Sequence, residues 1–132
     1  MDKLSHVFFL TGRALLGLYF IVPGVMKVLN FGGTSEYMAA HGMVLVPVFL
    51  VLTIVIQIAG GVSLAVGYRQ QAIAFVLAGL VLVINLVMHD FWTMEEGLQR
   101  AHEAQNFIKN LAIMAGLLVL AGRTAPDRNT WK

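Results

Sequence analysis

The sequence contains no cysteine, so the chain can form no disulfide and perform no thiol redox chemistry. Any redox role therefore requires a bound cofactor or a partner protein. The chain also has little excess of either charge, because its formal net charge is +2 and no run of five like charges occurs. So small and dispersed a charge argues against nucleic-acid binding.

Charged residues of both signs are few. They make up 12% of the 132 residues, against about 25% in a typical soluble domain, while hydrophobic residues make up 58%. A soluble core of this size has no room for so much apolar surface, so lipid has to be the solvent. The length fits one domain covering residues 1–132.

The first residues resemble a signal peptide, because Lys3 precedes an apolar stretch. Arg13 interrupts that stretch, however, and no small-residue cleavage site follows before Pro23-Gly24. We therefore interpret this segment as a retained first span.

Four stretches are long and apolar enough to cross a bilayer as helices, which takes about 20 residues each. They run from about 6 to 29, 44 to 66, 71 to 88 and 106 to 121. Gly67 closes the second stretch, and only residues 67–70 separate it from the third, so these two helices must be antiparallel neighbours. The sequence predicts an all-α, integral membrane four-helix bundle with both termini on the same side.

Local signals refine the ends of these helices. Residues 93–96 fit a capping box, which predicts that the last helix begins near residue 94, outside the hydrocarbon. Thr34 or Ser35 can cap a short helical turn that ends at Gly42. Pro47 is expected in the opening turn of the second span, where its missing N–H costs little.

Lysine and arginine are distributed unequally between the two sides. The side with the termini holds six, namely Lys3, Arg13, Arg69, Arg123, Arg128 and Lys132. The opposite side holds Lys27, Arg100 and Lys109, with the carboxylates of Glu36, Asp90, Glu95, Glu96 and Glu103. Because lysine and arginine favour the cytoplasmic side, both termini are predicted to be cytoplasmic.

Polar side chains inside spans are costly and usually face the bundle interior or water, so their positions are the best functional evidence. Residues three or four apart share a helix face. The predicted inward faces are Arg13, Gly17, Phe20, Gly24 and Lys27 on the first helix; Thr53, Gln57, Gly60, Gly61 and Leu64 on the second; Ala78, Leu82, Asn85 and His89 on the third; Asn106, Lys109, Asn110 and Ile113 on the fourth. Ala112 and Gly116 additionally offer a small-residue contact for close helix packing.

Nine residues follow as candidate ligand-binding residues: Arg13, Lys27, Gln57, Asn85, His89, Trp92, Asn106, Lys109 and Asn110. The predicted topology places most of them in the outer half of the membrane, with Gln57 near mid-depth and Arg13 toward the cytoplasm. The hypothesis is that helices of the bundle contribute polar groups to one interior, which is most polar at its periplasmic mouth. No catalytic residue and no metal site is predicted.

Each candidate also has a purely structural interpretation. Lys27 and Lys109 can extend to the lipid headgroups, and the amides can hydrogen-bond between helices. His89 can be an interfacial histidine without chemistry, and Trp92 can anchor the chain at the membrane surface. Arg13 is harder to explain in this way. No acidic residue lies within an apolar span, so its partner is expected to be carbonyl groups, a lipid phosphate or a ligand.

An ordered series of motifs runs from Gly12 to Gly122: Gly12-Arg13, Phe20-x-x-x-Gly24-x-x-Lys27, Glu36-Tyr37-Met38-x-x-x-Gly42, Gln57-x-x-Gly60-Gly61, Gly67, His89-x-Phe91-Trp92 and Gln105-Asn106-x-x-Lys109-Asn110. In order and spacing the series resembles the DoxX family of small bacterial four-helix membrane proteins. The resemblance implies a bacterial inner-membrane location and a link to membrane redox and oxidative-stress complexes, since the family is named from a subunit of a thiosulfate:quinone oxidoreductase. Many relatives carry glutamate where this chain has Gln57, which keeps hydrogen bonding but removes a proton acceptor.

The function expected from this resemblance and from the polar residues is an accessory or quinone-associated subunit of a membrane redox complex, without enzyme activity on its own. A quinone needs an apolar slot open to lipid and donors to its carbonyl oxygens, which Lys27, Lys109, Asn110, His89 and Gln57 can supply. His89 is the candidate proton carrier near neutral pH. No haem, flavin or iron–sulfur motif is present, so no intrinsic cofactor is expected beyond quinone or lipid, and electrons would come from a partner protein.

Two other functions stay open. The chain can be a non-catalytic scaffold that packs against other membrane proteins, or a small transporter, which would require a homo-oligomer because four spans enclose little space. The histidines carry no metal signature. His41, His89, Asp90 and His102 lack zinc-site spacing, and the four histidines fall at different depths, unlike the facing pairs that ligate haem.

Overall fold

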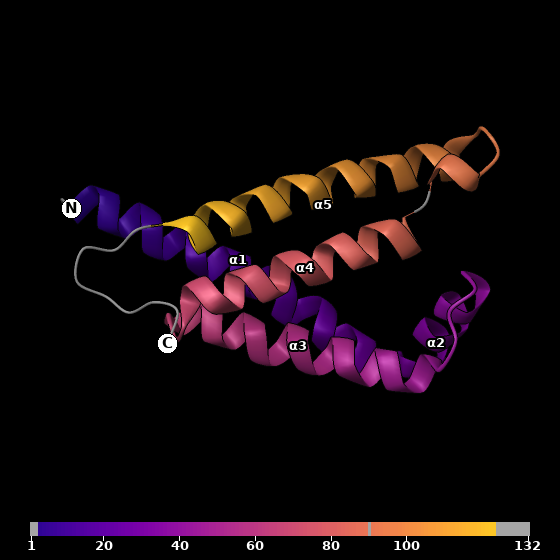
Figure 1. The fold of residues 1–132 in the computed structure, drawn as a ribbon, viewed down its shortest axis with the longest axis horizontal. Coiled ribbons are helices and arrows are strands. Elements are labelled where there is room, and N and C mark those ends of the chain that lie inside the picture. The colour runs from indigo at the N-terminus through magenta and orange to yellow at the C-terminus, as the bar shows by residue number, and fades with distance from the viewer. Residues whose placement is uncertain (1–2, 90, 124–132) are drawn as a thin grey trace.

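The structure, a computed structural model, describes residues 3–89 and 91–123. Its helices are α1 (Lys3–Leu29), α2 (Phe31–Ala40), α3 (Val46–Val66), α4 (Gln70–Met88), the 3₁₀ turn η1 (Phe91–Thr93) and α5 (Leu98–Gly122) (Figure 1). Of these, α1, α3, α4 and α5 are long and apolar enough to cross a membrane, and no strand occurs among the described residues. The predicted all-α architecture with four membrane-spanning helices is confirmed. The predicted roles of Asp90, Arg128 and Lys132 fall outside the described residues.

The spanning helices form two antiparallel pairs. Helix α1 packs along α3, and α4 packs along α5. A tight turn joins α3 to α4, as the sequence predicted, although it has three residues instead of four because α4 begins at Gln70. The pairs diverge from this turn toward α2 (Figure 1). Gly67 closes α3 in the left-handed conformation at φ 85°, and its N–H donates to Ser63 O at 2.9 Å. The α3–α4 turn, the start of α1 and the end of α5 lie at one end of the bundle, which we call the terminal half; the other is the α2 half.

The main core lies in the terminal half. Its buried residues come from α1, α3, α4 and α5: Phe20, Leu64, Ala74, Leu77, Ala78, Val81, Leu117, Leu120 and Ala121. Within it α1 and α3 approach so closely that a Cβ atom on Gly61 would lie 2.7 Å from Gly17 O. The two glycines therefore permit the backbone contact that the predicted faces of α1 and α3 implied.

The α2 half has a much smaller buried cluster. It consists of Met38, Val46 and Leu50, with Phe31, Met43, Ile54 and Met88 partly buried around it. Helix α2 follows α1 directly and ends before Gly42, which takes φ 80°. The predicted stop at Gly42 is confirmed, and so is Pro47 in the first turn of α3.

Two predicted helix starts are wrong. Thr34 and Ser35 lie inside α2 instead of capping it, and Ser35 Oγ donates to the carbonyl of Phe31 one turn earlier at 2.8 Å. Residues 93–96 form no capping box, because α5 begins only at Leu98. Gly97 ahead of it has φ 150°, a conformation that side-chain-bearing residues rarely adopt, so the helix cannot run back through this position.

Two predicted contacts are also wrong. Leu82 on α4 is 43% exposed, because the buried stripe of α4 runs through Ala74, Ala78, Val81 and Asn85 and passes beside it. Ala112 and Gly116 on α5 are exposed, and a Cβ atom on Gly116 would meet no atom within 4 Å. Their small-residue contact is therefore not made within the described chain.

A candidate ligand cavity in the alpha2 half

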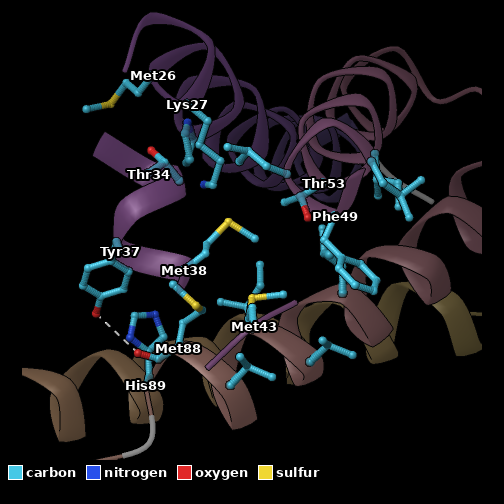
Figure 2. A pocket seen from close by; sticks show the side chains of 18 of the residues that line it. Met26, Lys27, Thr34, Tyr37, Met38, Met43, Phe49, Thr53, Met88 and His89 are labelled. Atoms are coloured by element: carbon cyan, nitrogen blue, oxygen red, sulfur yellow. Dashed lines mark hydrogen bonds between the residues drawn. The ribbon is translucent and has the colours of Figure 1, made fainter. Parts of the chain in front are cut away.

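A cavity of about 770 Å³ lies in the α2 half, where the two helix pairs diverge. Helices α1, α2, α3 and α4 all contribute to its walls. Most of the lining is apolar, and it includes the methionines Met26, Met38, Met43 and Met88 (Figure 2). Methionine side chains are flexible and polarisable, so this wall can adapt its shape to a ligand.

The cavity opens sideways into the membrane. Phe49 and Leu52 on α3 and Val76 and Val83 on α4 line it, yet each of these side chains is 41–55% exposed on the outer surface of the bundle. Gly79 lies among them on α4, and a Cβ atom there would meet no atom within 4 Å. The cavity is therefore open at the surface between α3 and α4, along the apolar part of both spans.

One end of the cavity is polar. This polar end consists of Lys27 from α1, Asn30 between α1 and α2, Thr34 and Tyr37 from α2, and His89 directly after α4. Figure 2 shows Lys27 and Thr34 on one side, and Tyr37 with His89 on the other, with the side chains of Met38 and Met88 between them. An amphiphilic molecule would be oriented by this arrangement, with its polar group at the α2 side.

Behind the polar end, Glu103 on α5 connects three helices. Its carboxylate accepts from Tyr37 OH at 3.3 Å and lies 3.0 Å from His89 Nδ1. Its other oxygen accepts from Asn106 Nδ2 at 3.3 Å. Glu103 is buried, and these contacts supply the partners that a buried carboxylate needs.

Of the nine candidate residues, the structure places Lys27 and His89 on the cavity. Asn106 contacts its polar end only through Glu103. Lys109 is exposed on α5, and Trp92 is 49% exposed, packing edge-on against Phe91 and Phe107.

The remaining amides are buried inside the bundle, away from the cavity lining. Asn110 Oδ1 accepts from Tyr19 OH at 2.7 Å, which links α5 to α1. Asn85 Nδ2 donates to Phe107 O at 3.0 Å, which links α4 to α5. Asn85 Oδ1 and Gln57 Oε1 are buried without a hydrogen-bond partner among the described residues.

Arg13 lies in the terminal half, far from the cavity along α1. It donates to Gln70 Oε1 at 3.0 Å and to Ala65 O at 3.5 Å. Its guanidinium stands 5.4 Å from the centre of the Phe9 ring. The carbonyl partners that the sequence suggested for Arg13 are therefore present beside the α3–α4 turn.

Sequence reasoning missed Glu103 and Tyr37 as part of the polar end. A signal for Glu103 existed, because it precedes Asn106 by three residues and Asn110 by seven and so shares their helix face. The predicted span began at residue 106, so Glu103 was counted only among the carboxylates outside the membrane, and its contacts with other helices were not predicted. Tyr37 had no such signal, since its contact with α5 spans 66 residues of sequence.

The described residues contain no group of three or more histidine, cysteine, aspartate or glutamate side chains that could hold a metal ion. His41 Nδ1 instead lies 2.9 Å from the Tyr37 carbonyl oxygen, and His102 is exposed on α5.

Four apolar helices and a laterally open cavity define a helical integral membrane protein with a ligand-sized internal space. The sequence profile of the DoxX family matches residues 8–90, and the chain belongs to this family of inner-membrane proteins.

Two curated relatives, both from Escherichia coli strain K12, match most of the chain. Inner membrane protein YqjF is 34% identical over 92% of this chain and 87% of its own length. Inner membrane protein YphA is 27% identical over 87% of this chain and 81% of its own length. No solved structure gives a significant match to the chain.

Proposed function

We propose that this protein binds a lipid-soluble, quinone-like ligand in its cavity and serves as a membrane subunit of a redox assembly. The observation that carries the proposal is the cavity of about 770 Å³, which is open between α3 and α4 and has mostly apolar walls, with polar side chains at the polar end and at Thr53. Pockets for small organic ligands have volumes of roughly 300–1,000 Å³ and combine apolar walls with a few placed polar groups.

The chemistry of the lining suits a quinone. An isoprenoid or alkyl tail would contact the methionines and the aliphatic side chains of α3 and α4. The ring carbonyl oxygens need hydrogen-bond donors, and Lys27 Nζ and the His89 ring stand at the polar end. Of the five donors expected from the sequence, only these two line the cavity, so Lys109, Asn110 and Gln57 are not part of this proposal.

Electron transfer requires a partner in this proposal. The sequence has no cysteine for thiol chemistry or for an iron–sulfur cluster, and a quinone alone needs a donor to reduce it. The chain would hold the quinone, and a second protein would supply or remove its electrons. Native mass spectrometry of the gently extracted complex reports the partner chain and the bound ligand together.

The cavity itself can be tested by blocking it. Gly79→Trp places a large side chain at the opening of the cavity, and Gly116→Trp places the same side chain on the exposed face of α5. At both positions an added Cβ atom would meet no atom within 4 Å. Each variant is extracted from membranes in lipid nanodiscs, and bound quinone is quantified by mass spectrometry of the organic extract.

We expect the unchanged protein and Gly116→Trp to retain about one quinone per chain. Gly79→Trp should retain at most about a tenth of that amount. A cavity that instead holds phospholipid would retain no quinone above the level of empty nanodiscs. Equal quinone content in the two tryptophan variants would place the ligand elsewhere. A scaffold protein, the alternative function, would keep its partner proteins in both variants and carry no quinone in either.

A further inference from the structure

We infer that His89, held by Glu103, exchanges a proton with an ionisable hydroxyl on the ligand in the cavity. The inference rests on the proposed function, because it requires an amphiphilic ligand whose polar group reaches the polar end. It assigns that ligand to a narrower class, the quinols and hydroxyquinones, whose ring hydroxyls gain and lose protons.

The first step is the fixed orientation of the imidazole ring. His89 Nδ1 lies 3.0 Å from Glu103 Oε2, and a carboxylate oxygen accepts a proton donor. The ring therefore carries hydrogen on Nδ1, which leaves Nε2 as the nitrogen that can meet a ligand. Since His89 also lines the cavity, the residue is in contact with both the Glu103 carboxylate and the ligand space.

The second step is the rigidity of the carboxylate. Tyr37 OH from α2 and Asn106 Nδ2 from α5 both donate to Glu103, at 3.3 Å each. Only 8% of the Glu103 side chain is exposed, against 19% of the His89 side chain. Glu103 is thus a positioning residue that holds the His89 ring, while His89 is the more exposed of the two side chains and lines the cavity.

The proton transfer is balanced without any electron donor. An imidazolium at His89 gives its Nε2 proton to the oxyanion of the ligand, which yields a neutral hydroxyl and a neutral imidazole that still carries its Nδ1 proton. Water returns a proton to Nε2. Throughout this cycle the carboxylate of Glu103 accepts the Nδ1 hydrogen of His89, so Nε2 is the atom that exchanges its proton with the ligand.

Two other groups face this site. Lys27 comes from α1 and lines the same cavity, so its positive charge also favours an anionic ligand. The Tyr37 hydroxyl, from α2, lies between Glu103 Oε2 and Met88 O, at 3.3 and 3.4 Å. A purely structural role for Glu103, in which it only ties α2, α4 and α5 together, would not make ligand binding depend on the ligand's own proton.

The test uses two synthetic probes that differ at one position. The first, 2-methyl-3-undecyl-1,4-naphthoquinone, has no ionisable proton. The second, 2-hydroxy-3-undecyl-1,4-naphthoquinone, has an acidic hydroxyl whose ionisation changes its visible absorption. Binding of both is measured in nanodiscs across pH for the unchanged protein, Glu103→Gln, His89→Gln and the control Glu96→Gln, whose carboxylate is almost fully exposed on the loop before α5.

In the unchanged protein and Glu96→Gln we expect the hydroxy probe to bind as its coloured anion. Glu103→Gln and His89→Gln should weaken its binding by about tenfold or more, which is the ratio expected from losing one hydrogen bond to a charged group. Both variants should also shift the colour change of the bound probe to higher pH. The methyl probe should bind all four proteins within about twofold, which also establishes that the cavity is intact.

The possible failures are distinguishable. If the methyl probe binds but the hydroxy probe titrates identically in the unchanged protein, Glu103→Gln and His89→Gln, the proton exchange is wrong and the proposed function stands. If Glu103→Gln loses both probes equally, Glu103 has only a structural role and the inference is overturned. If neither probe binds the unchanged protein, the inference fails together with the proposed function.

Discussion

The two halves of this bundle are packed differently, although the same four helices run through both. In the terminal half, glycines bring α1 and α3 into backbone contact, and a core of buried apolar residues joins both helix pairs. In the α2 half the pairs diverge, the buried cluster is small, and a cavity lined by methionines takes the place of a core. Tight packing at one end therefore allows the other end to stay open. The residues that stabilise the fold and the residues that line the cavity lie at different positions along the helix axes.

The largest expected effect comes from disrupting the contact between α1 and α3 in the terminal half. Gly61→Leu adds a side chain whose first atom would lie 2.7 Å from both Gly17 O and Ile21 Cγ1, so α1 and α3 cannot remain in contact. We expect loss of the folded protein, measured as aggregation on size-exclusion chromatography in mild detergent. The matched variant Gly79→Leu, in the opening of the cavity, should remain monodisperse, and equal behaviour of the two variants would contradict the division into halves.

A smaller effect is expected from removing core volume. Leu77 is fully buried where α3, α4 and α5 meet, so Leu77→Ala should lower the free energy of unfolding by about 3 kcal/mol. Leu52 lines the cavity and is half exposed, and Leu52→Ala should change stability by less than about 1 kcal/mol. Thermal unfolding of each variant in the same detergent checks this, and a larger loss for Leu52→Ala would refute the comparison.

The α3–α4 turn in the terminal half, from which the two helix pairs diverge, provides a third test. Gly67 has φ 85°, and an alanine in that conformation costs about 1–2 kcal/mol because its Cβ crowds the following carbonyl. The guanidinium of Arg13 would also have to move, since it lies within 3 Å of the added atom. Gly32→Ala on α2, where a Cβ meets nothing, is the control and should leave the unfolding temperature unchanged or slightly raised.

The smallest effect concerns one hydrogen bond between the helix pairs. Tyr19→Phe removes the 2.7 Å bond to Asn110 Oδ1, and such bonds between membrane helices contribute about 0.6 kcal/mol on average. A double-mutant cycle with Asn110→Ala measures this coupling directly. A coupling energy near zero would mean that the two side chains stabilise their helices independently.

Much of the fold followed from the sequence. The apolar stretches predicted all four spanning helices, and the three-to-four-residue spacing predicted the buried faces Gly17–Phe20–Gly24 on α1 and Gln57–Gly60–Gly61–Leu64 on α3. These signals are local, since hydropathy and helical period are properties of each segment alone. The cytoplasmic placement of the termini stays a prediction from the distribution of lysine and arginine.

The helix ends and side contacts were predicted less well. The capping-box pattern before α5 was overruled by Gly97, and Leu82 lies beside the buried stripe of α4 instead of within it. The first error is local, because Gly97 breaks the helix within the same segment as the capping-box pattern. The second is tertiary, because an apolar span offers several nearly equivalent faces and contacts with other helices select one of them.

Composition and hydropathy predicted that lipid is the solvent of this chain and that four helices cross it, and the order of the motifs predicted the DoxX family. The divergence of the helix pairs around a cavity, and the meeting of Tyr37, His89 and Glu103 at its polar end, could be found only in the folded chain. The physical reason is distance along the chain: these three side chains come from three helices, and only the packing of those helices brings their polar atoms within hydrogen-bonding distance.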